Sequence, residues 1–86
     1  MIQVPFNAEL AKEITEGRKF GLIKTRDGFN VRLLTFGVRS RYCIAGVVEL
    51  GDDEYVKQWT IDGKADYRPN VKTNYDLELF VEGGES

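Results

Sequence analysis

The amino-acid sequence predicts an α+β fold, in which a short N-terminal helix packs on a bent, five- or six-stranded antiparallel meander. Three observations predict this fold class. Residues 7–16 have helical spacing between a capping residue and a glycine, apolar and polar residues alternate from residue 20 onward, and only short polar segments separate the alternating runs. Short connections favour neighbouring antiparallel strands over crossovers. The same pattern fits a sheet that stays open and one that curls into a small open barrel.

The helix is expected within the segment PFNAELAKEITEG. Asn7 is a favourable N-cap because its side chain accepts hydrogen bonds from N–H groups of the first turn. Ala11 and Ile14 lie on one apolar face, and Phe6 is placed to pack against Ala11 across the cap. Gly17 ends the helix because glycine readily adopts the left-handed conformation required there. A helix of about three turns is marginal alone, so it is expected to dock on the sheet.

Six strands are expected after the helix, in segments rich in β-branched and aromatic residues. They are residues 20–25, 29–36, 41–50, 54–61, 64–67 and 75–81. The third, RYCIAGVVEL, is apolar on both faces and is expected at the centre of the sheet. Gly46 within it marks a bend or a close backbone approach. The last strand, YDLELFV, alternates and is expected to be half exposed.

This last strand is also a candidate for self-association. An unclosed meander leaves edge strands, and YDLELFV is long and apolar enough to pair with another copy. Its outward Asp76, Glu78 and Glu82 oppose such pairing by charge repulsion. The sequence therefore predicts a monomer or a weak homodimer.

A Thr-x-Asp-Gly sequence occurs twice, at residues 25–28 and 60–63. Asp-Gly between two alternating runs is a strong signal for a two-residue type I′ hairpin turn, which needs positive φ at both central residues. The threonine is expected to act only as a strand residue of high β propensity. A calcium loop would need alternating oxygen ligands and a later glutamate, and a phosphate loop would need more glycines before a helix. We therefore interpret both copies as turns.

The chain length predicts one globular domain at residues 1–82, followed by a flexible tail, GGES, at residues 83–86. Hydrophobic residues at 42% and charged residues at 30% are ordinary globular values. No apolar run is long enough to span a membrane, and no signal peptide is recognisable at the N-terminus. A cytoplasmic location without membrane contact is expected.

Histidine and cysteine usage excludes several chemistries. The chain has no histidine and a single cysteine, Cys43, so Ser-His and Cys-His catalysis, His-bearing or four-cysteine zinc sites and an internal disulfide are all excluded. Cys43 lies in an apolar run and is expected to behave as a small buried hydrophobe. No cofactor motif is present. The sequence predicts a protein that is not an enzyme and has no cofactor or catalytic or metal-binding residues.

Basic residues are concentrated in the first half of the chain, where the balance of charges is +4, against −6 in residues 44–86. Several of them alternate with aromatic residues, a combination that single-stranded nucleic-acid binders use for phosphates and bases. The candidate contacts for an anion or nucleic acid are Lys24, Arg26, Arg32, Arg39, Arg41 and Tyr42. The sequence pI of about 5.1 opposes this interpretation. Arg32 is equally suited to pair across strands with an acid such as Glu49.

An acidic group is the second candidate surface, and its members are Glu49, Asp52, Asp53 and Glu54. Neighbouring residues on a tight hairpin cannot surround a substrate as paired catalytic carboxylates do. The group is therefore either a solvated turn or an acidic face that contacts a basic protein surface.

The segments PFNAELAKEI, TRDGFNVRLL, WTIDGK and YDLEL resemble a group of small proteins carried by phages and integrated mobile elements of gut bacteria. No activity is known for the group, so the resemblance assigns no site residues, and VRSRYCIAG has no counterpart in its pattern. It implies an accessory protein of a mobile element. We expect a small soluble binding or adaptor domain that acts by protein–protein contact with an unidentified partner. The alternative is a single-stranded nucleic-acid-binding module using the surface around residues 24–42.

Overall fold

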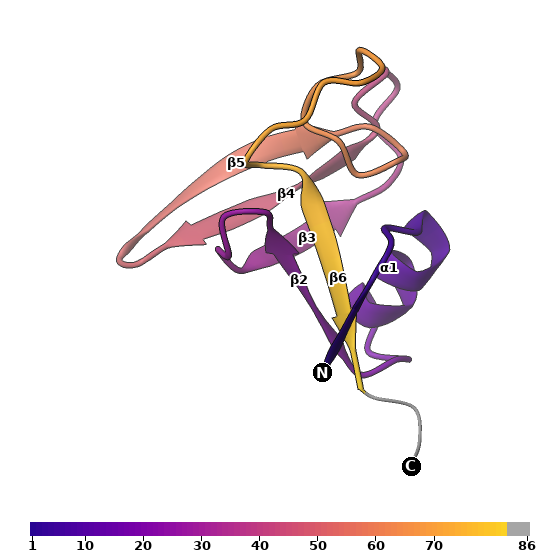
Figure 1. Ribbon diagram of the computed structural model, residues 1–86, viewed down its shortest axis with the longest axis vertical. Coiled ribbons are helices and arrows are strands. Elements are labelled where there is room, and N and C mark those ends of the chain that lie inside the picture. The colour runs from indigo at the N-terminus through magenta and orange to yellow at the C-terminus, as the bar shows by residue number, and fades with distance from the viewer. Residues whose placement is uncertain (83–86) are drawn as a thin grey trace.

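The computed structural model describes residues 1–82, which form one helix and six strands in two three-stranded antiparallel sheets (Figure 1). The first sheet has the order β1-β6-β2, with β1 at Ile2–Val4, β6 at Leu77–Val81 and β2 at Gly21–Thr25. The second has the order β3-β4-β5, with β3 at Val31–Thr35, β4 at Ile44–Leu50 and β5 at Asp53–Trp59. The α+β class is confirmed. The single meander is wrong, because only the second sheet follows chain order, and the sheets do not close into a barrel.

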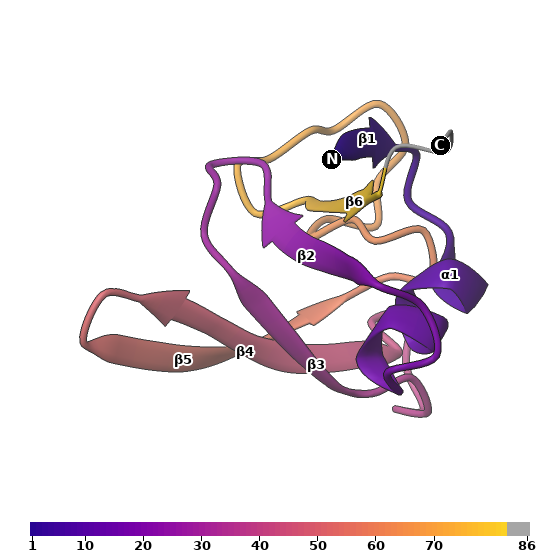
Figure 2. The ribbon, with the colours of Figure 1, turned by 90° about the horizontal axis from the view of Figure 1, so that it is seen from below.

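The predicted helix is confirmed as α1, Ala8–Thr15. The side chain of Asn7 accepts a hydrogen bond from the Leu10 N–H at 3.0 Å, as expected of an N-cap. Gly17 has φ +79° just beyond the C-cap. Ala11 is fully buried on the apolar face. The helix packs beside β2 and β3, where the two sheets meet (Figure 2).

β1 is an element that the sequence did not indicate. It has only three residues, which is too short for any alternation to be recognised, and Pro5 and Phe6 separate it from the helix cap. It pairs with β6, which also pairs with β2 and is therefore the central strand of its sheet. Self-association through an open edge of β6 is wrong, because both edges are occupied. The strand expected at residues 64–67 is also wrong, since that segment is irregular.

The central position of β4 is confirmed. Its apolar residues pair with β3 on one side and β5 on the other, and Ile44 and Val48 are fully buried. The prediction of a close approach at Gly46 is confirmed, because a Cβ there would lie 2.6 Å from the Arg32 carbonyl oxygen. The register of β3 shifts between Leu33 and Thr35 as it follows β4.

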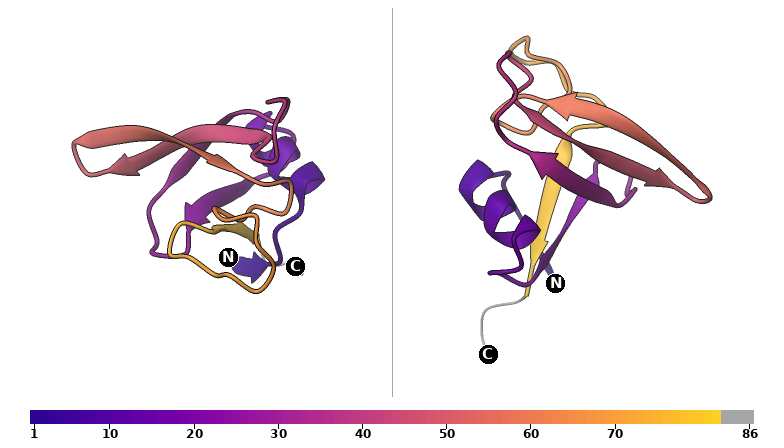
Figure 3. Two further views of the ribbon diagram at one scale, coloured as in Figure 1. Left: turned by 90° about the horizontal axis from the view of Figure 1, so that it is seen from above. Right: turned by 180° about the vertical axis from the view of Figure 1, so that it is seen from behind.

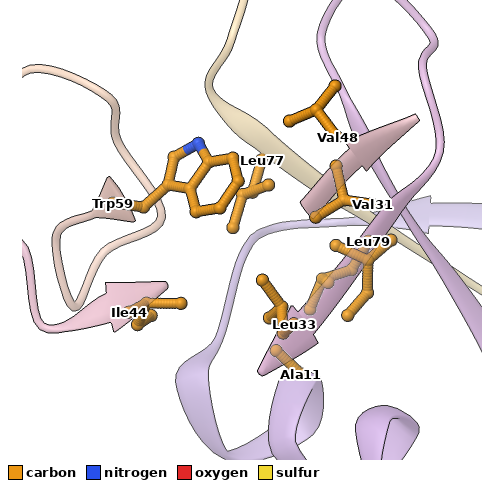
Figure 4. Packing of buried hydrophobic residues seen from close by; sticks show 9 residues of the cluster. Ala11, Val31, Leu33, Ile44, Val48, Trp59, Leu77 and Leu79 are labelled. Atoms are coloured by element: carbon orange, nitrogen blue, oxygen red, sulfur yellow. The ribbon is translucent and has the colours of Figure 1, made fainter. Parts of the chain in front are cut away.

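The core fills the space between the two sheets, with strands of one sheet running across those of the other (Figures 1 and 3). Trp59 is its largest fully buried side chain, and its indole N–H donates to the Tyr75 carbonyl oxygen at 2.7 Å. Figure 4 shows Trp59 beside Leu77. Leu33 and Leu79 belong to the same buried cluster and lie further from Trp59 in this view. The members of the buried cluster are Ala11, Ile23, Val31, Leu33, Ile44, Val48, Trp59, Leu77 and Leu79.

The two Thr-x-Asp-Gly segments have the same hydrogen-bonded structure, which we call corner 1 (residues 25–28) and corner 2 (residues 60–63). In each, the glycine N–H donates to the threonine carbonyl at 2.8 Å, and the threonine N–H donates to the carbonyl four residues later, at Phe29 and Lys64 respectively. Only the glycine has positive φ. The type I′ assignment is therefore wrong: each is a three-residue turn ending in a left-handed glycine.

The threonines of the corners do more than favour β structure. Thr25 is fully buried, and its hydroxyl oxygen accepts a hydrogen bond from the Phe29 N–H at 3.1 Å. Thr60 is nearly buried and accepts from the N–H groups of Asp62 and Lys64 at 3.3 and 3.2 Å. Each threonine hydroxyl thus stabilises its own turn by accepting hydrogen bonds from backbone N–H groups. The β propensity of threonine alone did not suggest this role.

Corner 1 takes the chain from one sheet to the other instead of joining two partners within a sheet. Beyond it, β2 and β3 share a single bridge, Lys24↔Asn30, and then diverge. A groove of about 440 Å³ lies between them beside α1, with Ile14, Leu22 and Leu34 among its lining residues. This divergence separates the sheets at the position where a closed barrel would need continuous pairing.

The segment that leads into β6 connects both corners, and we call this segment with the first residue of β6, residues 73–77, the strap. The carbonyl oxygens of Asn74 and Asp76 accept hydrogen bonds from N–H groups of corner 1, at 3.1 and 2.9 Å. On its other side, the Leu77 N–H donates to the Gly63 carbonyl of corner 2 at 2.8 Å. The Asp76 carboxylate, expected to point outward, accepts from the N–H groups of Ala65 and Thr73 and from the Thr73 hydroxyl.

Candidate binding surface

The six basic and aromatic candidates do not form one patch. Lys24 lies opposite Glu78 in the register of β2 and β6, and Arg26 lies in corner 1. Arg32 projects from β3. Only Arg39, Arg41 and Tyr42 stay together, in the loop between β3 and β4. The candidates thus occupy four separate places on the fold: β2, corner 1, β3 and the β3–β4 loop.

Arg32 joins the basic candidates to the acidic ones. Its guanidinium donates to Glu49 at 2.6 Å and to Glu54 at 3.3 Å, which confirms the cross-strand pairing with Glu49. Hydrogen bonding and charge from Glu54, followed by the charge of Glu49, raise the pKa of Arg32. Two of the four acidic candidates are therefore partly neutralised, and Asp52 and Asp53 remain at the tip of the β4–β5 hairpin.

A second loop, residues 64–72, lies beside the β3–β4 loop at the upper end of the molecule in Figure 1 and in the right-hand view of Figure 3. The Arg41 guanidinium lies 4.2 Å from the centre of the Tyr67 ring, within the range of a cation–π contact. Tyr42 meets the same ring edge-to-face at 6.3 Å, and its hydroxyl accepts a hydrogen bond from the Tyr67 N–H at 3.2 Å. We call the surface formed by Arg39, Arg41, Tyr42, Tyr67 and Arg68 the tyrosine end.

An ion pair borders Tyr67 on the same loop. Arg68 donates to both carboxylate oxygens of Asp66, at 3.0 and 2.6 Å. Hydrogen bonds from the Arg68 side chain and backbone, with the charges of Arg68 and Lys64, lower the pKa of Asp66 from 3.8 to about 2. Asp66 is therefore ionised at neutral pH, and the charges that lower its pKa are those of Arg68 and Lys64.

The other two tyrosines repeat this arrangement on the body of the fold. Tyr55 and Tyr75 meet edge-to-face at 6.4 Å, and the Lys57 ammonium lies 4.7 Å from the centre of the Tyr75 ring. Burial, followed by Tyr75, raises the pKa of Tyr55. An open groove of about 430 Å³ lies beside Tyr42 and β5, and it is lined by Tyr42, Val56, Lys57, Gln58 and Ala65.

Within residues 1–82, no group of three or more carboxylate or thiol side chains is placed to hold a metal ion. All buried side-chain polar atoms among those residues have hydrogen-bond partners. Cys43 is half-buried and packs against the core. No helix of the described residues has the length and apolar character needed to cross a membrane.

Tyr67 and Arg68 are the residues of this surface that sequence reasoning missed. The alternation places Tyr67 at the end of an expected strand and Arg68 between that strand and the next. Their partners Arg41 and Tyr42 lie about 25 residues away along the chain, and that separation is bridged only by the tertiary fold. No local pattern of alternation or turn chemistry signals such a contact.

No protein-family model matches the chain, and no curated protein or solved structure is significantly similar to it.

Proposed function

We propose that this protein is a small, non-enzymatic binding or adaptor domain that acts by protein–protein contact through its tyrosine end. The observation that supports this most directly is the placement of Tyr67. Its side chain is about half exposed, with a relative accessibility of 50%, yet Arg41 and Tyr42 hold it in position. A large aromatic ring fixed at the surface in this way is well suited to recognition.

Tyrosine and arginine are enriched at protein interfaces because they provide large contact areas together with hydrogen-bonding groups. Binding normally costs side-chain entropy, on the order of 0.5–1.5 kcal/mol for each immobilised side chain. The ring-to-ring and cation–π contacts around Tyr67 restrict these side chains before a partner arrives. A partner would therefore meet a surface that is already largely ordered.

The charge of the tyrosine end favours an acidic partner segment. Arg39, Arg41 and Arg68 lie in its two loops with Lys64 nearby, and Asp66 is their acidic neighbour. Complementary charge speeds association and disfavours wrong partners. A cytoplasmic location and an accessory role in a phage or mobile element belong to this proposal, and the second is supported by the sequence resemblance alone.

Affinity capture with paired variants tests the proposal. The immobilised protein and two double variants are each incubated with lysate of the host cell. Arg41→Ala/Tyr67→Ala alters the tyrosine end, and Asp52→Lys/Asp53→Lys, the matched control, alters the acidic tip of the β4–β5 hairpin. We expect the first variant to lose the captured partner and the second to retain it. Retention by the first variant with loss by the second would place the contact on the acidic hairpin tip instead.

Single-stranded nucleic acid remains the second candidate, because Arg41 and Tyr67 combine a cation with an aromatic ring at one surface. The negative net charge of the chain, −2, opposes it. Fluorescence anisotropy with labelled oligo-dT and oligo-rU at low salt separates the two functions. Salt-sensitive binding that Arg41→Ala/Tyr67→Ala abolishes would favour nucleic acid, whereas protein capture that survives nuclease treatment would favour a protein partner.

A further inference from the structure

β5 is an edge strand whose outer side is open. It pairs with β4 along all seven of its residues, and among residues 1–82 no other segment forms a hydrogen bond with the backbone of residues 53–58. Its hairpin with β4 projects away from the rest of the molecule (Figures 2 and 3). Three consecutive β5 residues, Val56, Lys57 and Gln58, also line an open groove together with Tyr42 and Ala65. An edge of this length is a template for pairing with another strand.

Strand geometry shows which residues of β5 face that open side. The Glu49 N–H of β4 donates to the Asn30 carbonyl on the β3 side, at 2.9 Å. Backbone groups alternate in direction along a strand, so Val48 faces β5 and Val47 faces β3. On β5, the residue opposite Val47 is Val56. The N–H and C=O groups of Val56 therefore point away from β4, and those of Glu54 and Gln58 do the same.

At the middle of β5 no charged side chain protects this edge. Proteins often guard an edge strand with an outward lysine, but the Lys57 ammonium lies over the Tyr75 ring. Val56, at the middle of the strand, has a relative accessibility of 69%. An apolar residue is thus exposed at the point where the backbone is unpaired.

We propose that β5 pairs with β5 of a second copy of this chain, in antiparallel register about a twofold axis at Val56, so that two three-stranded sheets join as one of six strands. Val56 then lies opposite Val56 of the partner subunit, and their backbone groups form a hydrogen-bonded pair. This inference does not depend on the proposed binding role of the tyrosine end.

The residues of β5 are complementary to themselves in this register. Glu54 lies opposite the partner's Gln58, and Tyr55 lies opposite the partner's Lys57, so no like charges face each other. Asp53 and the partner's Lys57 are diagonal neighbours of opposite charge. Twofold axes at Glu54 or Lys57 would instead place like charges directly opposite each other, which is destabilising.

The dimer is expected to be weak. Two seven-residue strands bury less than the roughly 1,200–2,000 Å² of a standard stable interface. Sedimentation equilibrium from about 10 μM to 1 mM covers the range expected for such a small contact. A monomer throughout that range would overturn the proposal.

Charge substitutions at Val56 test the register. Val56→Lys places two lysines opposite each other and should weaken dimerisation roughly tenfold or more. Val56→Glu should do the same, and an equimolar mixture of the two variants should recover association as a heterodimer. Leu34→Lys, another exposed apolar position but on β3, is the matched control and should leave the dissociation constant unchanged.

The folded state of the variants and their association together decide whether copies pair through β5. Val56 is exposed, so circular dichroism and melting curves are expected to show that these variants remain folded. A dimer that Val56→Lys does not weaken, or two variants that fail to associate when mixed, would mean that copies meet elsewhere or not at all. Recovery in the mixture, with no effect of Leu34→Lys, would support pairing through β5.

Discussion

The two corner glycines differ at the scale of single residues although their sequences match. Both have positive φ, +94° at Gly28 and +78° at Gly63. A Cβ at Gly28 would meet no atom within 4 Å, whereas one at Gly63 would lie 2.5–2.8 Å from carbons of the Phe6 ring. Glycine is needed at position 28 only because of its backbone conformation. At position 63 it is needed also because a Cβ would overlap the Phe6 ring.

We predict that Gly28→Ala lowers the free energy of unfolding by about 1–2 kcal/mol, the usual cost of a left-handed residue with a Cβ. Gly63→Ala should cost a further ~1–3 kcal/mol from overpacking against Phe6. Urea unfolding followed by fluorescence of the single tryptophan, Trp59, measures both. In a Phe6→Ala background the additional cost should disappear. Equal costs at the two glycines would contradict the contact with Phe6.

Acid titration provides the second prediction at this scale. Because Arg68 lowers the pKa of Asp66 from 3.8 to about 2, their pairing stabilises the fold fully above pH 3.8 and loses its effect as the pH falls through about 2. We expect Arg68→Gln to raise the pKa of Asp66 towards 3.8, measured by NMR of the carboxyl carbon. The difference in melting temperature from the natural chain should shrink between pH 5 and pH 2. Arg39→Gln, with no ion pair among residues 1–82, should show no such trend.

At the scale of elements, the corners rather than the strands join the two sheets. Corner 1 leads from β2 to β3, and corner 2 follows β5 before the chain returns to β6. Their threonine hydroxyls are acceptors for N–H groups in the interior of each turn. These hydroxyls should therefore contribute to stability through hydrogen bonding and not only through strand propensity.

We predict that Thr25→Val and Thr60→Val each destabilise the fold by about 1–3 kcal/mol, because valine keeps the shape and β propensity but leaves a turn N–H without its acceptor. Thr35→Val is the control, since its hydroxyl accepts from the Gly37 N–H in an exposed setting. That substitution should change stability by less than about 0.5 kcal/mol. Urea unfolding compares the three variants. A neutral Thr25→Val would show that the hydroxyl is dispensable in the turn.

Local signals predicted local structure well and tertiary structure poorly. The helix and its Asn7 cap follow from periodicity and capping, and the central position of β4 follows from a short run that is apolar on both faces. The pairing of β1 with β6 joins opposite ends of the chain, and no short segment encodes it. The candidate surface divides in the same way. Arg32 and Glu49 follow from strand pairing, whereas contact of Tyr67 with Arg41 depends on how two distant loops meet.

At the scale of the whole molecule, the strap connects both corners, with Asp76 at its centre. The carbonyl of Asp76 accepts from the Arg26 N–H of corner 1 at 2.9 Å, and its carboxylate accepts from the Ala65 N–H after corner 2 at 3.0 Å. The carboxylate also binds Thr73 through two hydrogen bonds. Opening of the strap should therefore loosen both corners together, even though they lie in different parts of the sequence.

The last prediction follows from that coupling. We expect Asp76→Ala to lower the free energy of unfolding by about 1.5–3 kcal/mol, the range for hydrogen bonds to a charged group. Native-state hydrogen exchange should show faster exchange at Arg26 and Ala65 together, beyond any change at Val48 in the core. Glu78→Ala, two residues further along the chain in β6, is the control and should leave the corners protected. Faster exchange confined to Ala65 would mean that the corners open independently and that the strap does not couple the two sheets.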